Sequence, residues 1–178
     1  MKILLRAATI IDSKSPFHNQ TMDILIQDGY IKQIGVALPT NGAEEIQLPQ
    51  LQISSGWFDS SASLGEPGFE DRETISNGLT VAAKSGFTAI ALQPNSHPII
   101  DNQGQINFVL NKAQNALTQL YPIGALTVGS EGKDMAELFD MKKAENDMLP
   151  EDILSDQNIA PGDRIIITDE SGVNTVTT

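Results

Sequence analysis

Polar side chains gather directly after two short apolar stretches of this chain. The stretch Ile53–Phe58 is followed by Asp59-Ser60-Ser61-Ala62-Ser63, and the stretch Phe87–Leu92 is followed by Gln93-Pro94-Asn95. Hydroxyl, amide and carboxylate groups can bind a polar ligand. The serines lack the Gly-x-Ser-x-Gly elbow and the nearby His–acid pair of a serine hydrolase, so a nucleophilic serine is not indicated.

Histidine and cysteine are scarce, which restricts metal chemistry. The chain has two histidines, His18 and His97, and no cysteine. A catalytic zinc commonly takes two or three histidines, and no close pair of histidines exists here. We interpret His97 as a surface loop residue. The lack of cysteine excludes disulfides, a thiol nucleophile and a thiolate metal site.

Two further clusters have a chemical and a structural interpretation. Four carboxylates near residue 70 could form a metal or acid–base site, but charge that complements a helix N-terminus, with Asp71 or a neighbour as the cap, is favoured. They are Glu66, Glu70, Asp71 and Glu73. The segment Gly129-Ser130-Glu131-Gly132 resembles a phosphate loop but lacks the Gly-Lys-Ser/Thr of a nucleotide site.

The elements that position these residues follow a β-α-β rhythm. We predict strand Ile53–Phe58, loop Asp59–Gly68, helix Thr74–Lys84 and strand Phe87–Leu92, which together form a parallel βαβ unit. A second helix is predicted at Gln105–Leu120, with Asp101 as a candidate N-cap. A third strand follows at Tyr121–Val128, and a third helix at Met135–Ala144. This order opens a barrel or an open α/β sheet.

The first fifty residues have a different pattern. Strands are predicted at Lys2–Ile11, Met22–Gln27, Tyr30–Gly35 and Glu44–Leu48. Asp28-Gly29 stands where a type I′ hairpin turn is expected. These residues predict a small antiparallel sheet. After residue 145 the pattern changes again, to an acidic segment and a β-branched strand at Arg164–Thr168.

Length and charge bound the function. With 178 residues the chain is shorter than a complete (β/α)8 barrel, which needs roughly 200 residues or more. The net charge of −12 argues against nucleic acid or an anionic membrane as a partner. No secretory segment and no apolar run long enough to span a bilayer is found, so a cytoplasmic protein is expected.

Several spaced motifs together resemble dihydroorotase of the amidohydrolase superfamily. They cover about residues 2–144 and comprise Met22–Ile26 with Asp28-Gly29, Gly56-Trp57-Phe58-Asp59, Leu64–Glu70, Ala82–Thr88, Gln93–Pro98 and Tyr121–Ala125. The resemblance implies reversible cyclisation of carbamoyl aspartate in pyrimidine synthesis, with zinc in a (β/α)8 barrel. It also implies a small β-sandwich built from both chain ends beside that barrel.

The family's first strand ends in Asp-x-His-x-His-x-Arg, where the histidines bind metal and the arginine pairs with the substrate carboxylate. This chain has Ser61 and Ser63 at the metal-ligand positions and Gly65 at the arginine position. Serine hydroxyls are poor zinc ligands, and glycine cannot make a bidentate carboxylate contact. Asn95 falls at the family's substrate-binding asparagine. No catalytic residue, no metal ligand and no bound zinc are therefore expected.

These inferences predict three regions and an α/β fold. Residues 1–52 are assigned to the β-sandwich, 53–144 to an incomplete TIM-type (β/α) barrel, and 145–178 to a linker with a possible closing sandwich strand. A stray hairpin is an equal alternative for that strand. Three βα units leave open parallel edges, so self-association or a covering partner is expected.

Two main functional hypotheses follow, with a third that is less specific. The first is a catalytically inactive dihydroorotase-like protein, a partner for aspartate carbamoyltransferase or for another dihydroorotase-like subunit. The alternative is an active zinc-dependent dihydroorotase whose site is completed by residues outside this chain. The third is a small-molecule binding module that uses Asn95 and the loop carboxylates.

Overall fold

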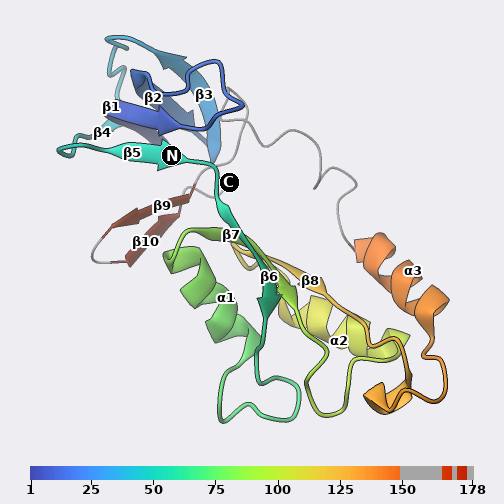
Figure 1. Ribbon diagram of the computed structural model, residues 1–178. Coiled ribbons are helices and arrows are strands. Elements are labelled where there is room, and N and C mark those ends of the chain that lie inside the picture. The colour runs from blue at the N-terminus through green and yellow to red at the C-terminus, as the bar shows by residue number, and fades with distance from the viewer. Residues whose placement is uncertain (149–165, 170–171, 176–178) are drawn as a thin grey trace. The chain divides into compact units, whose positions relative to one another are not determined.

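The computed structural model describes residues 1–148, 166–169 and 172–175, and side-chain environments up to residue 144 (Figure 1). The chain divides into two compact units, one with Met1–Ser55 and Leu154–Thr178, the other with Gly56–Ile153. Among the described residues, no helix is long and apolar enough to cross a membrane.

The N-terminal sheet is mixed. Strand β1 (Lys2–Ile11) pairs antiparallel with β2 (Thr21–Gln27), which pairs antiparallel with β3 (Tyr30–Gly35). On its other edge, β1 pairs parallel with β4 (Glu44–Ile46) and then with β5 (Gln52–Ser54). The prediction of a purely antiparallel sheet is wrong, because β1 has ten residues and accommodates two short parallel strands in succession.

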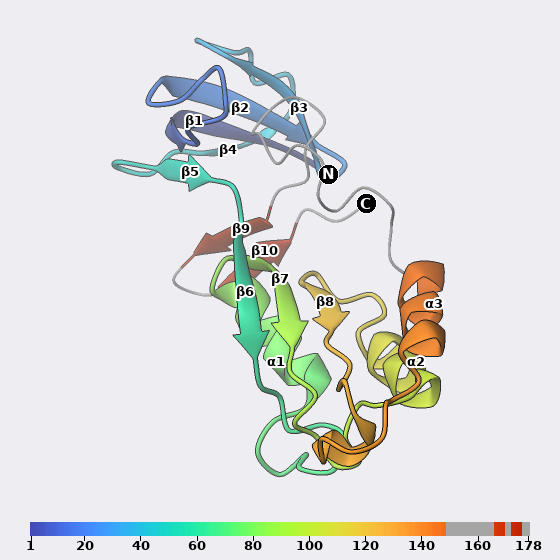
Figure 2. The same ribbon diagram turned by 45° about the vertical axis from the view of Figure 1, so that its right-hand side comes forward.

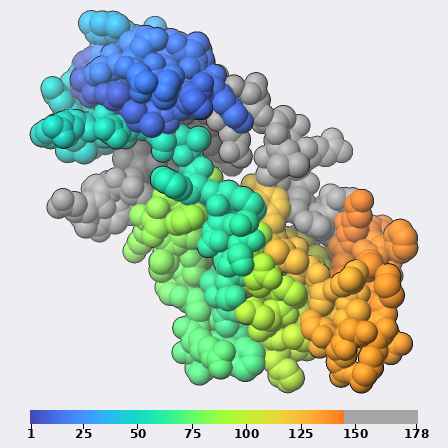
Figure 3. All heavy atoms as spheres, viewed as in Figure 1, coloured from blue at the N-terminus to red at the C-terminus, as the bar shows by residue number. Residues whose placement is uncertain are grey.

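The Asp28-Gly29 hairpin is confirmed. Both residues adopt positive φ angles, 53° and 84°, as a type I′ turn requires. The space-filling view shows this sheet in blue to cyan (Figure 3). Leu4 of β1 packs with Leu38 and Ala43 in a small cluster, and most of the sheet's other apolar residues are buried in a larger cluster. Its fully buried members are Ile3, Leu5, Ala8, Ile10, Ile24, Ile26 and Ile31.

Arg6 joins the strands of this unit through its guanidinium. It donates to Asp23 Oδ2 at 2.7 Å and to Glu45 Oε1 at 2.6 Å. It also donates to the Leu38 carbonyl and the Thr40 hydroxyl. The bonds from Arg6 and Thr40 lower the pKa of Glu45 from 4.5 to about 2. Burial raises the pKa of Asp23, but hydrogen bonds outweigh it and the net shift is downward.

The second unit is a three-stranded parallel sheet with helices. Strands β6 (Trp57–Ala62), β7 (Phe87–Leu92) and β8 (Gln119–Pro122) pair in that order, as the predicted βαβ rhythm requires. Helix α1 (Ile75–Lys84) links β6 to β7, and α2 (Gln103–Lys112) links β7 to β8. Figures 1 and 2 show both helices on the same side of the sheet.

The core of this unit lies between the sheet and the helices. Ile90, Leu92 and Leu120 of the strands pack with the helical residues, and Met141 of α3 (Leu138–Met148) closes the cluster. The helical members are Ile75, Leu79, Ile106, Val109 and Leu110. Each helix buries a stripe of apolar side chains, as the sequence spacing predicts.

Several predicted boundaries are wrong. The predicted strand Ile53–Phe58 is split, since β5 ends at Ser54 and β6 begins at Trp57 and continues to Ala62. Asp59 and Ser61 therefore lie on a strand rather than in a loop. Helix α2 ends at Lys112 although apolar spacing continues to Leu117, and α3 begins at Leu138 rather than at Met135.

Near the C-terminus, β9 (Ile166–Asp169) pairs antiparallel with β10 (Gly172–Thr175) in a sheet of their own. The described part of the predicted strand Arg164–Thr168 is thus extended. The part of the acidic segment 145–157 that follows residue 148 falls outside the described residues. The closing sandwich strand and the three-region division remain predictions.

Candidate functional site

A polar row crosses the carboxyl ends of β6 and β7. The side-chain amide of Gln93 donates to the Ser61 hydroxyl at 3.3 Å, and that of Asn95 donates to the Ser63 hydroxyl at 2.9 Å. Asp59 accepts the Ser61 N–H at 2.9 Å. Of the residues named from the sequence, Asn95 therefore contacts Ser63 directly, and Ser61 contacts Gln93 instead.

The parallel pairing of β6 and β7 places these side chains. Ala62 registers with Leu92, and the Gln93 N–H donates to the Ala62 carbonyl at 2.9 Å. Residues that follow the two strands then meet at one edge of the sheet, where open α/β sheets bind ligands. The sequence pattern marks Gln93 as the first residue after the strand, but it does not predict the contact of Gln93 with Ser61.

The backbone of the β6–α1 loop closes around Gly65. The Gly65 N–H donates to the Glu73 carbonyl at 3.1 Å, and its carbonyl accepts the Phe69 N–H at 2.8 Å. A Cβ atom at residue 65 would lie 2.0 Å from the Phe69 carbonyl oxygen and 2.8 Å from that of Glu73. Gly65 is buried, so this loop conformation leaves no space for a side chain at that position.

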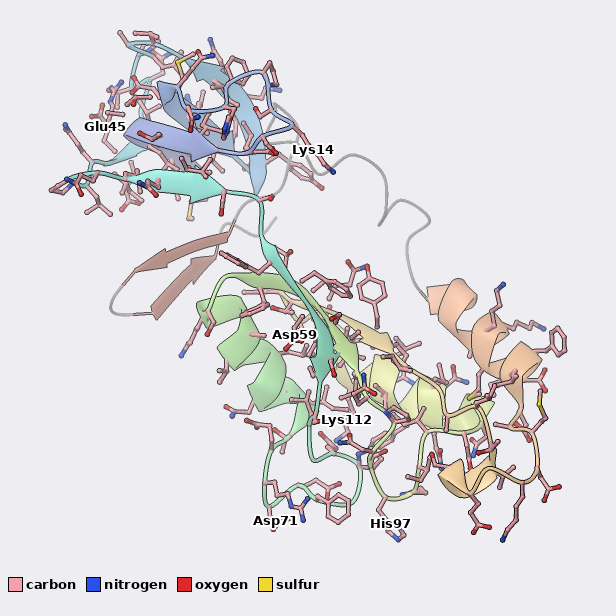
Figure 4. The ribbon with its side chains drawn as sticks, viewed as in Figure 1. Lys14, Glu45, Asp59, Asp71, His97 and Lys112 are labelled. Carbon is pink, nitrogen blue, oxygen red and sulfur yellow. The ribbon has the colours of Figure 1, made fainter. Side chains whose placement is uncertain are left out.

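The same loop is joined to the loop that follows β7. The His97 N–H donates to the Pro67 carbonyl at 2.9 Å, and a Cβ at Gly68 would lie 2.0 Å from the His97 carbonyl oxygen. The rings of Phe69 and His97 are 6.4 Å apart. Figure 4 shows His97 and Asp71 on these two neighbouring loops. His97 is exposed, as predicted for a surface loop histidine.

Glu66 is the only buried member of the predicted carboxylate cluster. Its side chain is 6 % exposed, and it accepts the Ile75 N–H at 3.0 Å and Lys112 Nζ at 2.7 Å. The bond to Glu66 raises the pKa of Lys112. Glu66 therefore joins the loop to the first residue of α1 by a hydrogen bond and to the last residue of α2 by an ion pair. Nothing in the sequence spacing indicated Lys112.

The other carboxylates of the cluster serve local backbone groups. Glu70 accepts the Gly68 N–H, which lowers the pKa of Glu70, and Glu73 accepts the Thr74 N–H and the Asn77 side-chain amide. The N-cap of α1 is Thr74, so a residue near Asp71 caps the helix rather than Asp71 itself. Among the described residues, no group of three or more His, Cys, Asp or Glu side chains could hold a metal ion.

The glycine-rich segment 129–132 does not form a phosphate loop. The Gly129 N–H donates to the Asp101 carboxylate at 2.8 Å, and the Gly132 N–H donates to the Thr127 hydroxyl at 3.0 Å. The Asp101 carboxylate already occupies the position that a bound anion would need. The N-cap of α2 is Asn102, so the prediction of Asp101 as the N-cap is wrong.

Comparison with known proteins identifies the family of this chain. A family model described as dihydro-orotase-like matches residues 52–159. The chain belongs to this family. Dihydroorotase of Pelotomaculum thermopropionicum is 39 % identical over 144 residues, and that of Syntrophotalea carbinolica is 40 % identical over 147. Each match covers 81 % of this chain and 34 % of the relative, so this dihydroorotase-like chain spans about a third of their length.

Solved structures agree on the fold of this dihydroorotase-like chain. A dihydroorotase crystal structure matches 82 % of the chain and 39 % of its own length, with a TM-score of 0.58 at 15 % identity. An L-hydantoinase from Arthrobacter aurescens gives a TM-score of 0.57 at 16 % identity, over 82 % of this chain and 31 % of its own. The chain is a mixed α/β protein with neighbours among amidohydrolases of the TIM-barrel fold.

The described residues of this dihydroorotase-like chain do not fit the zinc of the family. Ser61 and Ser63 stand where the resemblance places histidines, and each hydroxyl already accepts a hydrogen bond from an amide. A neutral hydroxyl is a weak ligand for zinc, which prefers imidazole, thiolate and carboxylate. The donor set at the ends of β6 and β7 is therefore suited to hydrogen bonding rather than to metal binding.

Proposed function

We propose that this dihydroorotase-like chain is non-catalytic and serves pyrimidine biosynthesis as a partner of another protein. The observation that carries the proposal is Gly65, at the position of the family's substrate arginine. A Cβ atom at residue 65 would lie 2.0 Å from the Phe69 carbonyl oxygen. An arginine cannot be restored there without a new loop conformation. Ser61 and Ser63 at the metal-ligand positions support the same conclusion.

The sheet of the second unit supports the need for a partner. Ile90 and Leu92 face the helices, so the alternate residues of β7, Ala89 and Ala91, face the other way. Phe58 registers with Ala89 and Tyr121 with Ala91, which places both rings on that second face. The rings contact edge to face with centroids 6.2 Å apart, and Phe58 is 58 % exposed.

Parallel sheets are normally covered on both faces, and edge strands pair readily with other chains. Within the described residues, β6 and β8 each pair on one side only. We propose that the partner covers this face and these edges. Aspartate carbamoyltransferase, or another dihydroorotase-like subunit, is the partner that the family resemblance suggests.

Metal analysis together with turnover tests the catalytic part of the proposal. The purified chain is dialysed against zinc, and its metal content and its hydrolysis of dihydroorotate are measured. We expect substoichiometric zinc and no turnover. Stoichiometric zinc with turnover would favour the alternative, an active dihydroorotase. A rise in melting temperature with carbamoyl aspartate, without turnover, would indicate a binding module and contradict a purely structural role.

Light scattering tests the partner separately. We expect the chain alone to self-associate, and to form a defined complex when mixed with aspartate carbamoyltransferase or an active dihydroorotase. Phe58→Ser removes the exposed ring from the uncovered face and should weaken association, whereas Phe139→Ser, at a 91 % exposed position on α3, is the matched control. A monodisperse monomer that binds neither protein would refute the partner role.

A further inference from the structure

The chain contains two Asn-Gly pairs in opposite environments. Asn41-Gly42 lies in an exposed turn before β4, and Asn77-Gly78 lies in the first turn of α1. Asparagine before glycine can lose its side-chain amide without an enzyme. The backbone nitrogen of the glycine attacks the asparagine Cγ, a five-membered imide forms, and ammonia leaves. Water then opens the ring to an aspartyl or isoaspartyl residue.

The first pair is open to this reaction. Asn41 and Gly42 have φ angles of 42° and 75°, the left-handed pair of a tight turn, and one bond from the Ala43 N–H to the Thr40 carbonyl closes that turn. A Cβ at Gly42 would meet no atom within 4 Å. Neither the Gly42 N–H nor the Asn41 side chain hydrogen-bonds to another described residue. The Asn41 carbonyl accepts a hydrogen bond from Lys2 Nζ at 3.0 Å.

The second pair is protected by the helix. The Gly78 N–H donates to the Thr74 carbonyl at 2.9 Å. The Asn77 side-chain amide donates to both carboxylate oxygens of Glu73, at 2.9 and 3.2 Å. Gly78 is buried, and a Cβ at this position would lie 2.5 Å from Leu64 Cδ2. Attack by the Gly78 nitrogen requires the start of α1 to unwind, whereas attack at Gly42 requires only the opening of an exposed turn.

We propose that Asn41 is a spontaneous deamidation site of this protein and that Asn77 is not. The product has a structural consequence, because the turn begins at Thr40 and leads to Glu45, and both of these residues bind Arg6. An isoaspartyl residue lengthens the backbone at position 41 by one carbon. It also adds a negative charge to a chain with a net charge of −12. The link from Arg6 to β4 is expected to weaken as the product accumulates.

Peptide mapping of aged protein tests the proposal. The folded chain is incubated in mildly alkaline buffer and digested, and the mass gain of deamidation is followed at both positions. We expect conversion at residue 41 to be at least about tenfold faster than at residue 77, a ratio that corresponds to about 1.4 kcal/mol. Equal rates, or faster conversion at residue 77, would refute it. The denatured chain, in which both pairs are exposed, should convert both at similar rates.

Two variants separate the deamidation of Asn41 from its effect on the contacts of Arg6. Asn41→Gln removes the reactive spacing and should abolish ammonia release from this turn while the fold is retained. Asn41→Asp adds the charge without lengthening the backbone. Aged protein rich in isoaspartate should melt at a lower temperature than Asn41→Asp. If the two melt alike, the lengthened backbone does not disturb the contacts of Arg6, and that part of the proposal is wrong.

Discussion

The side-chain amide of Asn95 donates a hydrogen bond of 2.9 Å to the hydroxyl of Ser63. In the family that the sequence resembles, the first of these positions contacts substrate and the second binds metal. In this chain the side chains at these two positions are hydrogen-bonded to each other. Gln93 and Ser61 form a second amide–hydroxyl bond at the same edge of β6 and β7.

Restoring the histidines should create a metal site. The double substitution Ser61→His and Ser63→His places two imidazoles at spacing i, i+2 at the end of β6, where the family holds metal. We expect the affinity for zinc to rise at least about tenfold (~1.4 kcal/mol), as measured by competition with a chromogenic chelator. Ser61→Ala with Ser63→Ala is the control. If it binds zinc as well as the double histidine variant, the site is elsewhere.

A side chain at residue 65 should destabilise the loop. We expect Gly65→Ala to lower the free energy of unfolding by about 1–3 kcal/mol, because its Cβ would overlap the Phe69 carbonyl. Urea denaturation measures this. Gly104→Ala in α2 is the control: its Cβ would lie 3.3 Å from the N-cap oxygen of Asn102 rather than overlap backbone, so a change within about 1 kcal/mol is expected. A Gly65→Ala protein as stable as the native chain would mean that the loop rearranges freely.

Pattern alone located most strands but not every element end. Apolar runs placed β1 and β7, and the Asp28-Gly29 turn placed β3, each with the bounds that the structure shows. The end of α2 was missed because Leu117 continues the helical spacing, while Ala113 ends the helix and Asn115 adopts a φ of 64°. The competing contact is tertiary: the Thr118 hydroxyl donates to the Phe87 carbonyl at 2.7 Å.

The candidate site was predictable in part for a similar reason. Motif spacing marked Ser61, Ser63 and Gly65 along the chain, and it aligned Asn95 with them. The contact of Gln93 with Ser61 depends on the register between two strands. The contact of Glu66 with Lys112 depends on how α2 packs, because the partners are 46 positions apart in the sequence. Neither can be derived from one segment alone.

The ion pair between Glu66 and Lys112 should contribute to stability. Glu66→Gln leaves an amide facing Lys112 in a buried position, and we expect a loss of about 1–3 kcal/mol in the free energy of unfolding. Lys112→Met should also destabilise, and the double variant should lose less than the sum of the two single losses. Chemical denaturation of all four proteins completes the cycle. Additive losses would show that the two side chains do not interact.

Acid should weaken the N-terminal unit through Glu45. Its pKa is lowered on folding from 4.5 to about 2, so the folded state binds its proton less readily than the unfolded state does. The stabilisation is therefore present above about pH 4.5 and is lost as the pH falls from about 4.5 towards 2. Glu45→Gln should flatten the dependence of melting temperature on pH in this window, as measured by circular dichroism. Glu44→Gln is the control, because the Glu44 side chain has no ion pair or hydrogen bond with any described residue. An unchanged pH profile for Glu45→Gln would mean that Arg6 does not stabilise this carboxylate in solution.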